Sequence, residues 1–243
     1  MLTVPDSAPP RAARGFEAVD TWVFDLDNTL YPPHLDLWSQ IDQRMKTYIA
    51  GFLGLSHDEA FRLQKDYYRR FGTSMRGLMI HHGLDPEEFL AYVHDIDHSP
   101  LAPDPRLGAA LERLAGKKLI LTNGSVAHAE AVTKRLGLDH HFDGVFDIIA
   151  ADFIPKPSPE TYARFLDRHA IDPGRAAMFE DLARNLEVPH ALGMTTVLVT
   201  PDNTREIERE AWELEGHADP HIDHVTSDLA GFLGGLAPDG VER

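Results

Sequence analysis

Four short stretches of the sequence carry side chains that could do chemistry on an anion: FDLDNTL at 24–30, LTNGS at 121–125, KPSPE at 156–160 and FEDLARN at 179–185. Their carboxylates include Asp25, Asp27, Glu180 and Asp181, and Lys156 supplies a cation. Carboxylate oxygens are hard ligands that suit Mg²⁺ better than zinc or copper. A lysine, hydroxyl groups and loop N–H groups are donors that suit a phosphate. A hard cation beside such donors would make a phosphate site.

Each stretch has a simpler explanation when it is taken alone. The segment DLDNT is rich in residues that favour turns, and TNGS is typical of a loop that caps a helix. Lys156 stands between two prolines and could lie at the surface, whereas Glu180 and Asp181 could cap the following helix. Two carboxylates about 4 Å apart, however, repel each other by about 4 kcal/mol at an effective dielectric constant of about 20. We therefore expect several carboxylates at one place only where a cation offsets their charge.

The pair Asp25 and Asp27 fits a reaction that needs two carboxylates in different protonation states. A phosphate monoester is so inert that enzymes accelerate its hydrolysis by up to about 10²¹-fold. A covalent route divides the reaction into two displacements with a carboxylate as nucleophile. One carboxylate must then stay ionised and attack phosphorus, while the other carries a proton to the leaving oxygen. The spacing alone leaves open which aspartate does which.

The elements that must position these residues alternate along the chain. Runs rich in Val, Ile and Leu predict strands at 19–24, 117–122, 144–150, 176–179 and 195–199, and helical patterns lie at 104–115, 125–136, 158–170 and 182–191. Ser158, followed by Pro159, is a typical start for the third of these helices. This alternation predicts a parallel sheet covered on both faces, which is a Rossmann-like three-layer α/β core. In such a sheet the residues after each strand meet at the carboxyl edge, where ligands bind.

The segment 33–100 breaks the alternation and is helical throughout. SHDE at 56–59 is a capping box, and DPEE at 85–88 combines an Asp cap with proline at the first helical position. We therefore predict a flexible lead-in at 1–17, a core formed by 18–32 and 101–243, and an inserted helical cap at 33–100. In the tail we expect a helix at about 203–215 and a short strand near His224.

Composition excludes several classes of partner. The formal net charge is −16, which argues against a nucleic acid polymer because phosphate backbones are bound through clustered Lys and Arg. Cysteine is absent, so disulfides and thiolate chemistry are excluded. No run of about 18 apolar residues and no signal-peptide core is present, so we expect no membrane span and a cytoplasmic location. The oligomeric state has no signature in the sequence.

The sequence resembles the haloacid dehalogenase-like (HAD) hydrolase superfamily. The resemblance rests on four motifs in order, FDLDNTL, LTNGS, KPSPE and FEDLARN, and it covers about 20–30 and 103–200 of the core. The position of the helical insertion matches the superfamily's helical-cap class. The resemblance implies that Asp25 is the nucleophile and Asp27 the general acid/base.

The same resemblance implies a phosphate site and a Mg²⁺ site. Thr122 and Lys156 would hold the phosphoryl oxygens, with Asn123 assisting. Asp181 would bind Mg²⁺ directly, and Glu180 through water. Asp25 would add its carboxylate and Asp27 its backbone carbonyl to the metal. The expected cofactor is therefore Mg²⁺.

More narrowly, three longer segments resemble the pyrimidine 5′-nucleotidase branch: FDLDNTLYPPHLDLW, RGLMIHHGLDPEEFLAYVHDID and FEDLARNLEVPHALGM. This resemblance implies a nucleoside monophosphate such as UMP or CMP as substrate. The alternatives are a sugar-phosphate phosphatase or a phosphomutase of the same superfamily. A 2-haloacid dehalogenase is disfavoured because dehalogenases lack an aspartate at the position of Asp27. A non-catalytic phospholigand-binding protein is disfavoured because all four motifs are retained.

Several cap residues are candidates for contacts with the leaving group: Arg76, Tyr48, His34 and Asp36. The aromatic residues Trp38, Tyr67 and Tyr68 could stack on a base, although at helical spacing such residues more often form the core of a cap. The 14 histidines invite a metal hypothesis, above all His217, His221 and His224, but a solvated tail is the simpler explanation. The pairs at 81–82 and 140–141 have the simple explanation of surface or helix-end residues.

Overall fold

A computed structural model describes residues 13–201 and 219–236 of the chain. Its centre is a parallel sheet with the strand order β3-β2-β1-β4-β5-β6. The strands are β1 (Thr21–Phe24), β2 (Lys117–Leu121), β3 (Gly144–Phe146), β4 (Ala176–Glu180), β5 (Thr195–Val199) and β6 (His224–Thr226). β1 is buried along its whole length, as expected of a central strand that is covered on both faces.

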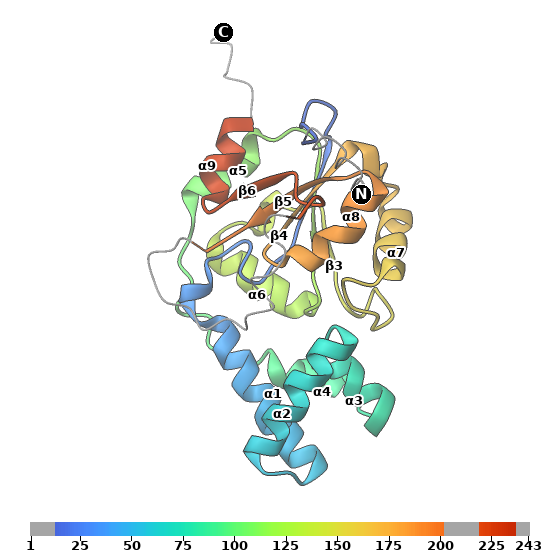
Figure 1. Ribbon diagram of the computed structural model, residues 1–243. Coiled ribbons are helices and arrows are strands. Elements are labelled where there is room, and N and C mark those ends of the chain that lie inside the picture. The colour runs from blue at the N-terminus through green and yellow to red at the C-terminus, as the bar shows by residue number, and fades with distance from the viewer. Residues whose placement is uncertain (1–12, 202–218, 237–243) are drawn as a thin grey trace, which may run out of the picture.

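Helices cover both faces of the sheet (Figure 1). One face carries α5 (Pro105–Arg113), α6 (Val126–Leu136) and α9 (Leu229–Leu236), and the other carries α7 (Pro159–His169) and α8 (Glu187–Leu192). Successive residues of β1 point to opposite faces, so Trp22 and Phe24 pack in the first of these layers and Val23 in the second. This arrangement confirms the predicted Rossmann-like three-layer α/β core.

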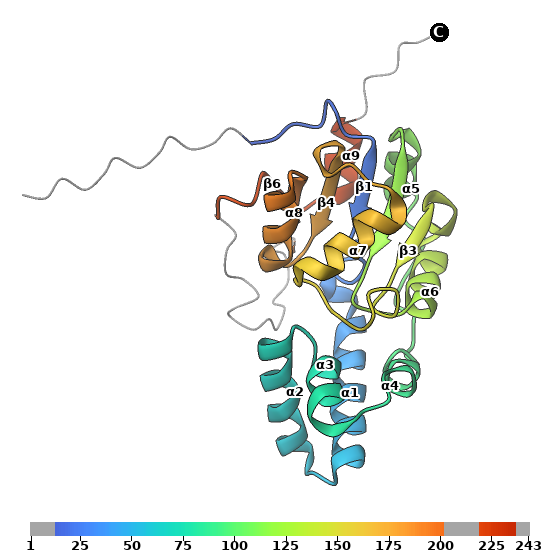
Figure 2. The ribbon, with the colours of Figure 1, turned by 90° about the vertical axis from the view of Figure 1, so that its right-hand side faces the viewer.

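The inserted cap consists of α1 (Leu37–Leu53), α2 (His57–Phe71), α3 (Ser74–His82) and α4 (Pro86–Val93). Figures 1 and 2 both place these helices beyond one end of the sheet, on the side reached by the loop after β1. The predicted capping box is present, because Ser56 Oγ accepts from Glu59 N–H and the Glu59 side chain accepts from Ser56 N–H. The cap has its own apolar cluster, in which Ile49, Leu78 and Phe89 are buried.

The structure departs from the predicted elements in the second half of the core. β3 ends at Phe146 rather than at residue 150, because Asp147 accepts hydrogen bonds from Val126 N–H and Ala150 N–H and turns the chain out of the sheet. Ser158 is the N-cap residue of α7, but its side chain makes no capping hydrogen bond. The glycine-rich helix α9 was not predicted.

The structure describes the two ends of the chain only in part. The predicted loose lead-in extends to residue 17, yet Arg14 Nη1 donates to Met194 O (2.7 Å) and Phe16 stacks on Trp22. Residues 1–12 and the predicted helix at 203–215 lie outside the described residues. The predicted last strand is present as β6.

Candidate active site

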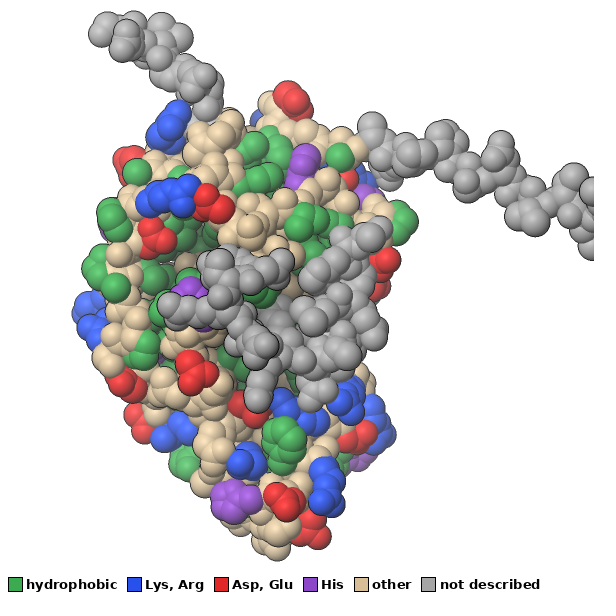
Figure 3. All heavy atoms as spheres, turned by 60° about the vertical axis from the view of Figure 1, so that its left-hand side comes forward, with side chains coloured by type: hydrophobic (Ala, Val, Ile, Leu, Met, Phe, Trp, Pro, Cys, Tyr) green, Lys and Arg blue, Asp and Glu red, His purple; other side chains and the backbone are tan. Residues whose placement is uncertain are grey.

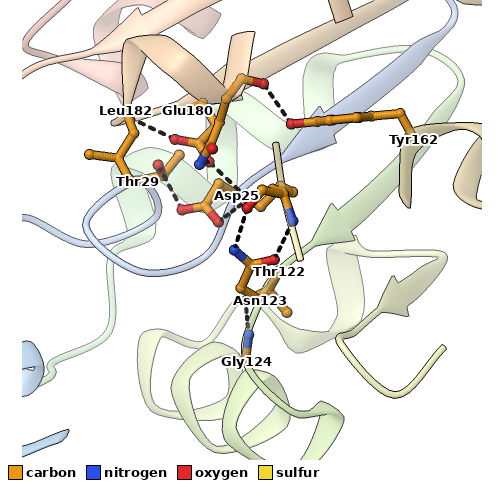
Figure 4. Close-up of polar contacts among 10 residues, drawn as sticks. Asp25, Thr29, Thr122, Asn123, Gly124, Tyr162, Glu180 and Leu182 are labelled. Atoms are coloured by element: carbon orange, nitrogen blue, oxygen red, sulfur yellow. Dashed lines mark hydrogen bonds and ion pairs between the residues drawn. The ribbon is translucent and has the colours of Figure 1, made fainter. Parts of the chain in front are cut away.

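The sheet topology brings the four motif segments to one edge. Asp25 follows β1, Thr122 follows β2 and Asp181 follows β4, so all three lie at the carboxyl ends of neighbouring strands. Lys156 lies in the loop before α7. Figure 4 shows Asp25, Asn123 and Glu180 gathered at this edge, where hydrogen bonds and ion pairs join each of them to Lys156.

The segment after β1 is a turn that holds Asp25 at the strand mouth. Asp25 N–H donates to Phe179 O (2.9 Å), which continues the pairing of β1 with β4. Asn28 adopts the left-handed conformation, with φ of 62°, which asparagine tolerates better than most residues. Thr29 Oγ1 donates to Asp25 Oδ2 (3.2 Å). The turn-forming residues of DLDNT therefore have a structural task as well as a chemical one.

Lys156 is the buried cation of the site. Its side chain is 1% exposed, and Nζ donates to Asp25 Oδ1 (2.6 Å) and to Glu180 Oε1 (2.8 Å). Asn123 fixes the backbone at this point, because Lys156 N–H donates to Asn123 Oδ1 (2.8 Å) and Asn123 Nδ2 donates to Lys156 O (3.3 Å). Burial disfavours the charged lysine, but the adjacent carboxylates of Asp25 and Glu180 raise the pKa of Lys156 well above its usual value.

Asp25, Glu180 and Asp181 form a buried acidic cluster. One carboxylate oxygen from each lies within 4.8 Å of the others, and all three residues are buried. Within the described residues this is the one cluster of three acidic or imidazole groups with the spacing of a metal site. Lys156 forms ion pairs with two of the three carboxylates, and hard oxygen ligands suit a divalent cation. The residues present therefore fit Mg²⁺.

Glu180 is held by three donors. Its Oε1 accepts from Lys156 Nζ and from Asn185 Nδ2 (2.5 Å), and its Oε2 accepts from Leu182 N–H (2.7 Å). Tyr162, in turn, donates to Asn185 O (2.6 Å) (Figure 4). The sequence stretch FEDLARN thus supplies both an acid and the asparagine that orients it.

Burial raises the pKa of Asp25 to about 7, against the opposing attraction of Lys156, and the charges of Glu180 and Asp27 raise it further. A metal ligand must be ionised, so at pH 6 Asp25 has to release a proton when Mg²⁺ binds. We expect more protons to be released per ion at pH 6 than at pH 8, and Mg²⁺ affinity to fall as the pH is lowered through the raised pKa of Asp25. Calorimetric titration of Mg²⁺ in two buffers of different ionisation enthalpy measures this proton release. Equal proton release at the two pH values would contradict the expectation, and Asp25→Asn should remove the difference.

Asp27 is surrounded by groups that the sequence analysis missed. Its Oδ1 accepts from Tyr31 Oη (2.5 Å) and lies 2.8 Å from His128 Nε2, and the ring of His94 stacks on that of His128. Burial alone would raise the pKa of Asp27, but His128 and the Tyr31 hydrogen bond lower it to about 2. Tyr31 lies four residues after Asp27, so its proximity could have been recognised from the sequence, whereas no local signal links His128 to Asp27, which lies 101 residues away.

A cavity of about 1110 Å³ opens over this edge and extends into the cap. From the core it is lined by all the predicted catalytic, phosphate and metal residues, namely Asp25, Asp27, Thr122, Asn123, Lys156, Glu180 and Asp181. From the cap it is lined by His34, Asp36, Trp38 and Tyr68 among the residues singled out in the sequence, and also by Phe61 and Gln64.

Three other candidates from the cap do not line this cavity. Tyr67 is buried in the cap core, in edge contact with Phe71. Tyr48 packs against Phe89 and Tyr92, and Arg76 lies in the first turn of α3. The geometry of the described residues thus gives no support to Arg76 or Tyr48 as leaving-group contacts, because neither residue lines the cavity.

Two of the three histidines near the C-terminus have backbone partners. His221 Nε2 contacts Ala183 O (2.9 Å) and His224 Nε2 contacts Arg14 O (2.6 Å), so these two are partly buried rather than solvated. His217 lies outside the described residues. His81, His82 and His140 are exposed, as expected.

Comparison with known proteins decides the family. The sequence profile described as haloacid dehalogenase-like hydrolase matches residues 19–193. The chain belongs to this family. The profile spans the inserted cap and the core from β1 to α8, and it ends before β5.

Three similar proteins share between 20% and 30% sequence identity with this chain. Phosphate metabolism protein 8 of Saccharomyces cerevisiae is 30% identical over 208 residues, which cover 78% of this chain and 64% of the yeast protein, so the match spans less than two thirds of that relative. The fructose-1-phosphate phosphatase of Escherichia coli is 25% identical over 186 residues, covering 72% of this chain and 93% of that protein. A HAD phosphatase from Thermococcus onnurineus has the same fold, with a TM-score of 0.58 and 20% identity, and the match covers 92% of this chain and 100% of that protein.

Among the described residues, no helix combines the length and hydrophobicity that a membrane crossing requires.

Proposed function

We propose that this HAD hydrolase is a Mg²⁺-dependent phosphomonoester hydrolase that works through a phosphorylated Asp25. The observation that carries the proposal is the buried cluster in which Lys156 bridges Asp25 and Glu180 beside Asp181. Phosphatases among the relatives and structural neighbours support it further.

Asp25 and Asp181 would hold Mg²⁺ directly, together with the backbone carbonyl of Asp27. Glu180 would act through water, since its carboxylate accepts three hydrogen bonds within the described residues whereas that of Asp25 accepts two. When bound, the ion supplies positive charge that offsets the carboxylates and stabilises the charge of a phosphoryl group.

The residues divide the reaction between them. Asp25 attacks phosphorus in line and the bond to the leaving oxygen breaks, while Asp27 donates a proton to that oxygen. Water then attacks the phosphorus of phospho-Asp25, Asp27 takes up a proton from this water, and inorganic phosphate leaves as Asp25 is regenerated. Thr122, Asn123 and Lys156 would hold the phosphoryl oxygens through both steps.

The protonation state of Asp27 must change when substrate binds. In the free protein its pKa of about 2 makes Asp27 a carboxylate at neutral pH. A phosphate dianion beside it would raise that pKa, because like charges disfavour ionisation. We infer that Asp27 acquires the proton it donates together with the substrate.

We propose a nucleoside monophosphate such as UMP or CMP as the substrate. The cavity is large enough for a nucleotide, and Trp38, Phe61 and Tyr68 offer aromatic surfaces on its cap side. On the face drawn in Figure 3, acidic and basic side chains are interspersed over the core and the cap, which suits a small ligand better than a nucleic acid polymer. A sugar phosphate is the second candidate, favoured by the similarity to the fructose-1-phosphate phosphatase.

Phosphate release from a panel of nucleotides and sugar phosphates, with Mg²⁺ and with EDTA, tests the proposal. We expect UMP and CMP to give the highest kcat/KM and EDTA to abolish turnover. A panel led by sugar phosphates would overturn the nucleotide assignment alone. Isomerised sugar phosphate would indicate a mutase and chloride from 2-haloacids a dehalogenase. Tight binding of a phosphorylated ligand without turnover would indicate a binding protein.

Trp38 lines the cavity from α1 and is the residue on which a base would stack. Stacking of a base on an aromatic side chain contributes about 1–3 kcal/mol, so Trp38→Ala should raise KM for UMP by about tenfold or more. The KM for a short sugar phosphate should change much less. Phe52→Ala is the matched control, because Phe52 lies on the same helix, is 42% exposed and does not line the cavity. Equal effects of Trp38→Ala on both substrates would argue against stacking.

A further inference from the structure

The two oxygens of the Asp27 carboxylate have different surroundings. Oδ1 lies at hydrogen-bond distance from both Tyr31 Oη (2.5 Å) and His128 Nε2 (2.8 Å). Oδ2 accepts no hydrogen bond from any residue of the described ranges 13–201 and 219–236. Because Asp27 lines the cavity, the oxygen that remains available for proton exchange with a ligand is Oδ2.

Tyr31 can act only as a donor in this contact. Its ring is buried at 2% exposure, and burial together with the adjacent Asp27 charge raises the pKa of its hydroxyl well above the usual value. The hydroxyl therefore keeps its proton and directs it to Oδ1. The turn that carries Asp27 also carries Tyr31, so the pair is fixed locally.

His128 reaches the same oxygen from a different part of the chain. It lies in the first turn of α6, where its N–H donates to the N-cap Ser125 Oγ (3.3 Å), and its side chain is fully buried. With the carboxylate at Nε2, that nitrogen carries the proton, and Nδ1 is a buried atom without a partner among the described residues. The ring thus has a single polar contact, which is the one to Asp27.

The cap fixes the orientation of the His128 ring. His94, the C-cap residue of α4, stacks on it with ring centroids 4.6 Å apart and an interplanar angle of 10°, and His94 Nδ1 lies 3.0 Å from Ser125 Oγ. The His98 ring also lies beside the His128 ring, with the two ring centroids 5.6 Å apart. Both histidines belong to the segment that leads from the cap back to the core.

We propose that Tyr31 and His128 are positioning residues that hold Asp27 by Oδ1, so that Oδ2 delivers the proton to the leaving oxygen, and that His94 of the cap orients His128 for this role. The inference rests on the proposed phosphatase function. It adds that part of the acid/base machinery is assembled across the boundary between cap and core.

The dependence of the rate on the leaving group tests this inference. An alkyl leaving group such as the nucleoside of UMP must be protonated as it departs, whereas p-nitrophenolate departs without a proton. The ratio kcat/KM reports the steps up to departure of the leaving group and not the later hydrolysis of phospho-Asp25. We expect His128→Ala to lower kcat/KM for UMP by about 10²-fold, because general acid catalysis contributes about 10²–10⁴-fold. The loss with p-nitrophenyl phosphate should be at least about tenfold smaller.

Two further variants separate positioning from folding. Tyr31→Phe keeps the ring and removes only the hydroxyl, so it should show the same difference between the two substrates. His128→Gln, whose side-chain N–H can reach a similar place, should recover part of the lost activity towards UMP. Equal losses with both substrates in His128→Ala and Tyr31→Phe would overturn the inference. If the unmodified protein releases no phosphate from either ester, the proposed function itself fails, and the two failures are thereby distinguished.

Discussion

Asp25→Asn should lower kcat for phosphate release by about 10⁴-fold or more, which is the scale of loss when a nucleophile is removed. An amide nitrogen or oxygen cannot form the acyl phosphate that the proposed route requires. The shape of the side chain is preserved, and the carbonyl oxygen can still accept from Lys156, so the fold should persist. Phosphate release with UMP at saturating Mg²⁺ is the measurement.

The covalent intermediate gives an independent check on Asp25. An acyl phosphate is reduced by borohydride to homoserine, so quenching the unmodified protein during turnover should place homoserine at position 25 in its peptide map. Asp139→Asn is a matched control, because Asp139 is exposed in η2 (Asp139–His141) and does not line the cavity. Full activity in Asp25→Asn, or homoserine at another position, would contradict the assignment.

Lys156→Met should be both inactive and less stable. Lys156 is the cation that offsets Asp25 and Glu180 in the buried site, and removing one partner of a buried ion pair costs about 3–5 kcal/mol of unfolding free energy. Loss of a donor to the phosphoryl oxygens should lower kcat/KM by about 10²–10³-fold. Urea unfolding in EDTA measures the first effect, and phosphate release the second.

Mg²⁺ distinguishes an electrostatic origin of this instability from a packing defect. If uncompensated carboxylates are the cause, saturating Mg²⁺ should stabilise Lys156→Met more than it stabilises the unmodified protein, since a ligand that binds the native state shifts the folding equilibrium. Lys134→Met, at an exposed position on α6, should change stability by less than about 0.5 kcal/mol. Unchanged stability of Lys156→Met in EDTA would refute the argument.

Local patterns predicted most elements of the described fold. Capping signals such as Ser56 with Glu59, and the buried run TWVF in β1, act within a few residues of sequence, so they can be recognised without a tertiary structure. The prediction failed where a single side chain overrides the local pattern. Asp147 ends β3 early through hydrogen bonds to Val126, 21 residues away, and to Ala150. Helix α9 was missed because its three glycines lower helix propensity. Packing of its apolar side chains against the sheet stabilises it instead.

The four ordered motifs predicted which side chains gather at the site, because the alternation of strands and helices requires them to meet at one edge of the sheet. How these side chains are held depends on packing between segments that are distant in the sequence. The contact between His128 and Asp27 joins residues 101 positions apart, and the stacking of His94 on that ring depends on how the cap sits on the core. Helical periodicity could not tell that Trp38 lines the cavity and Tyr48 does not, because both faces of a cap helix carry aromatic residues. Spatial neighbours of this kind are fixed by packing between distant segments, which no local pattern records.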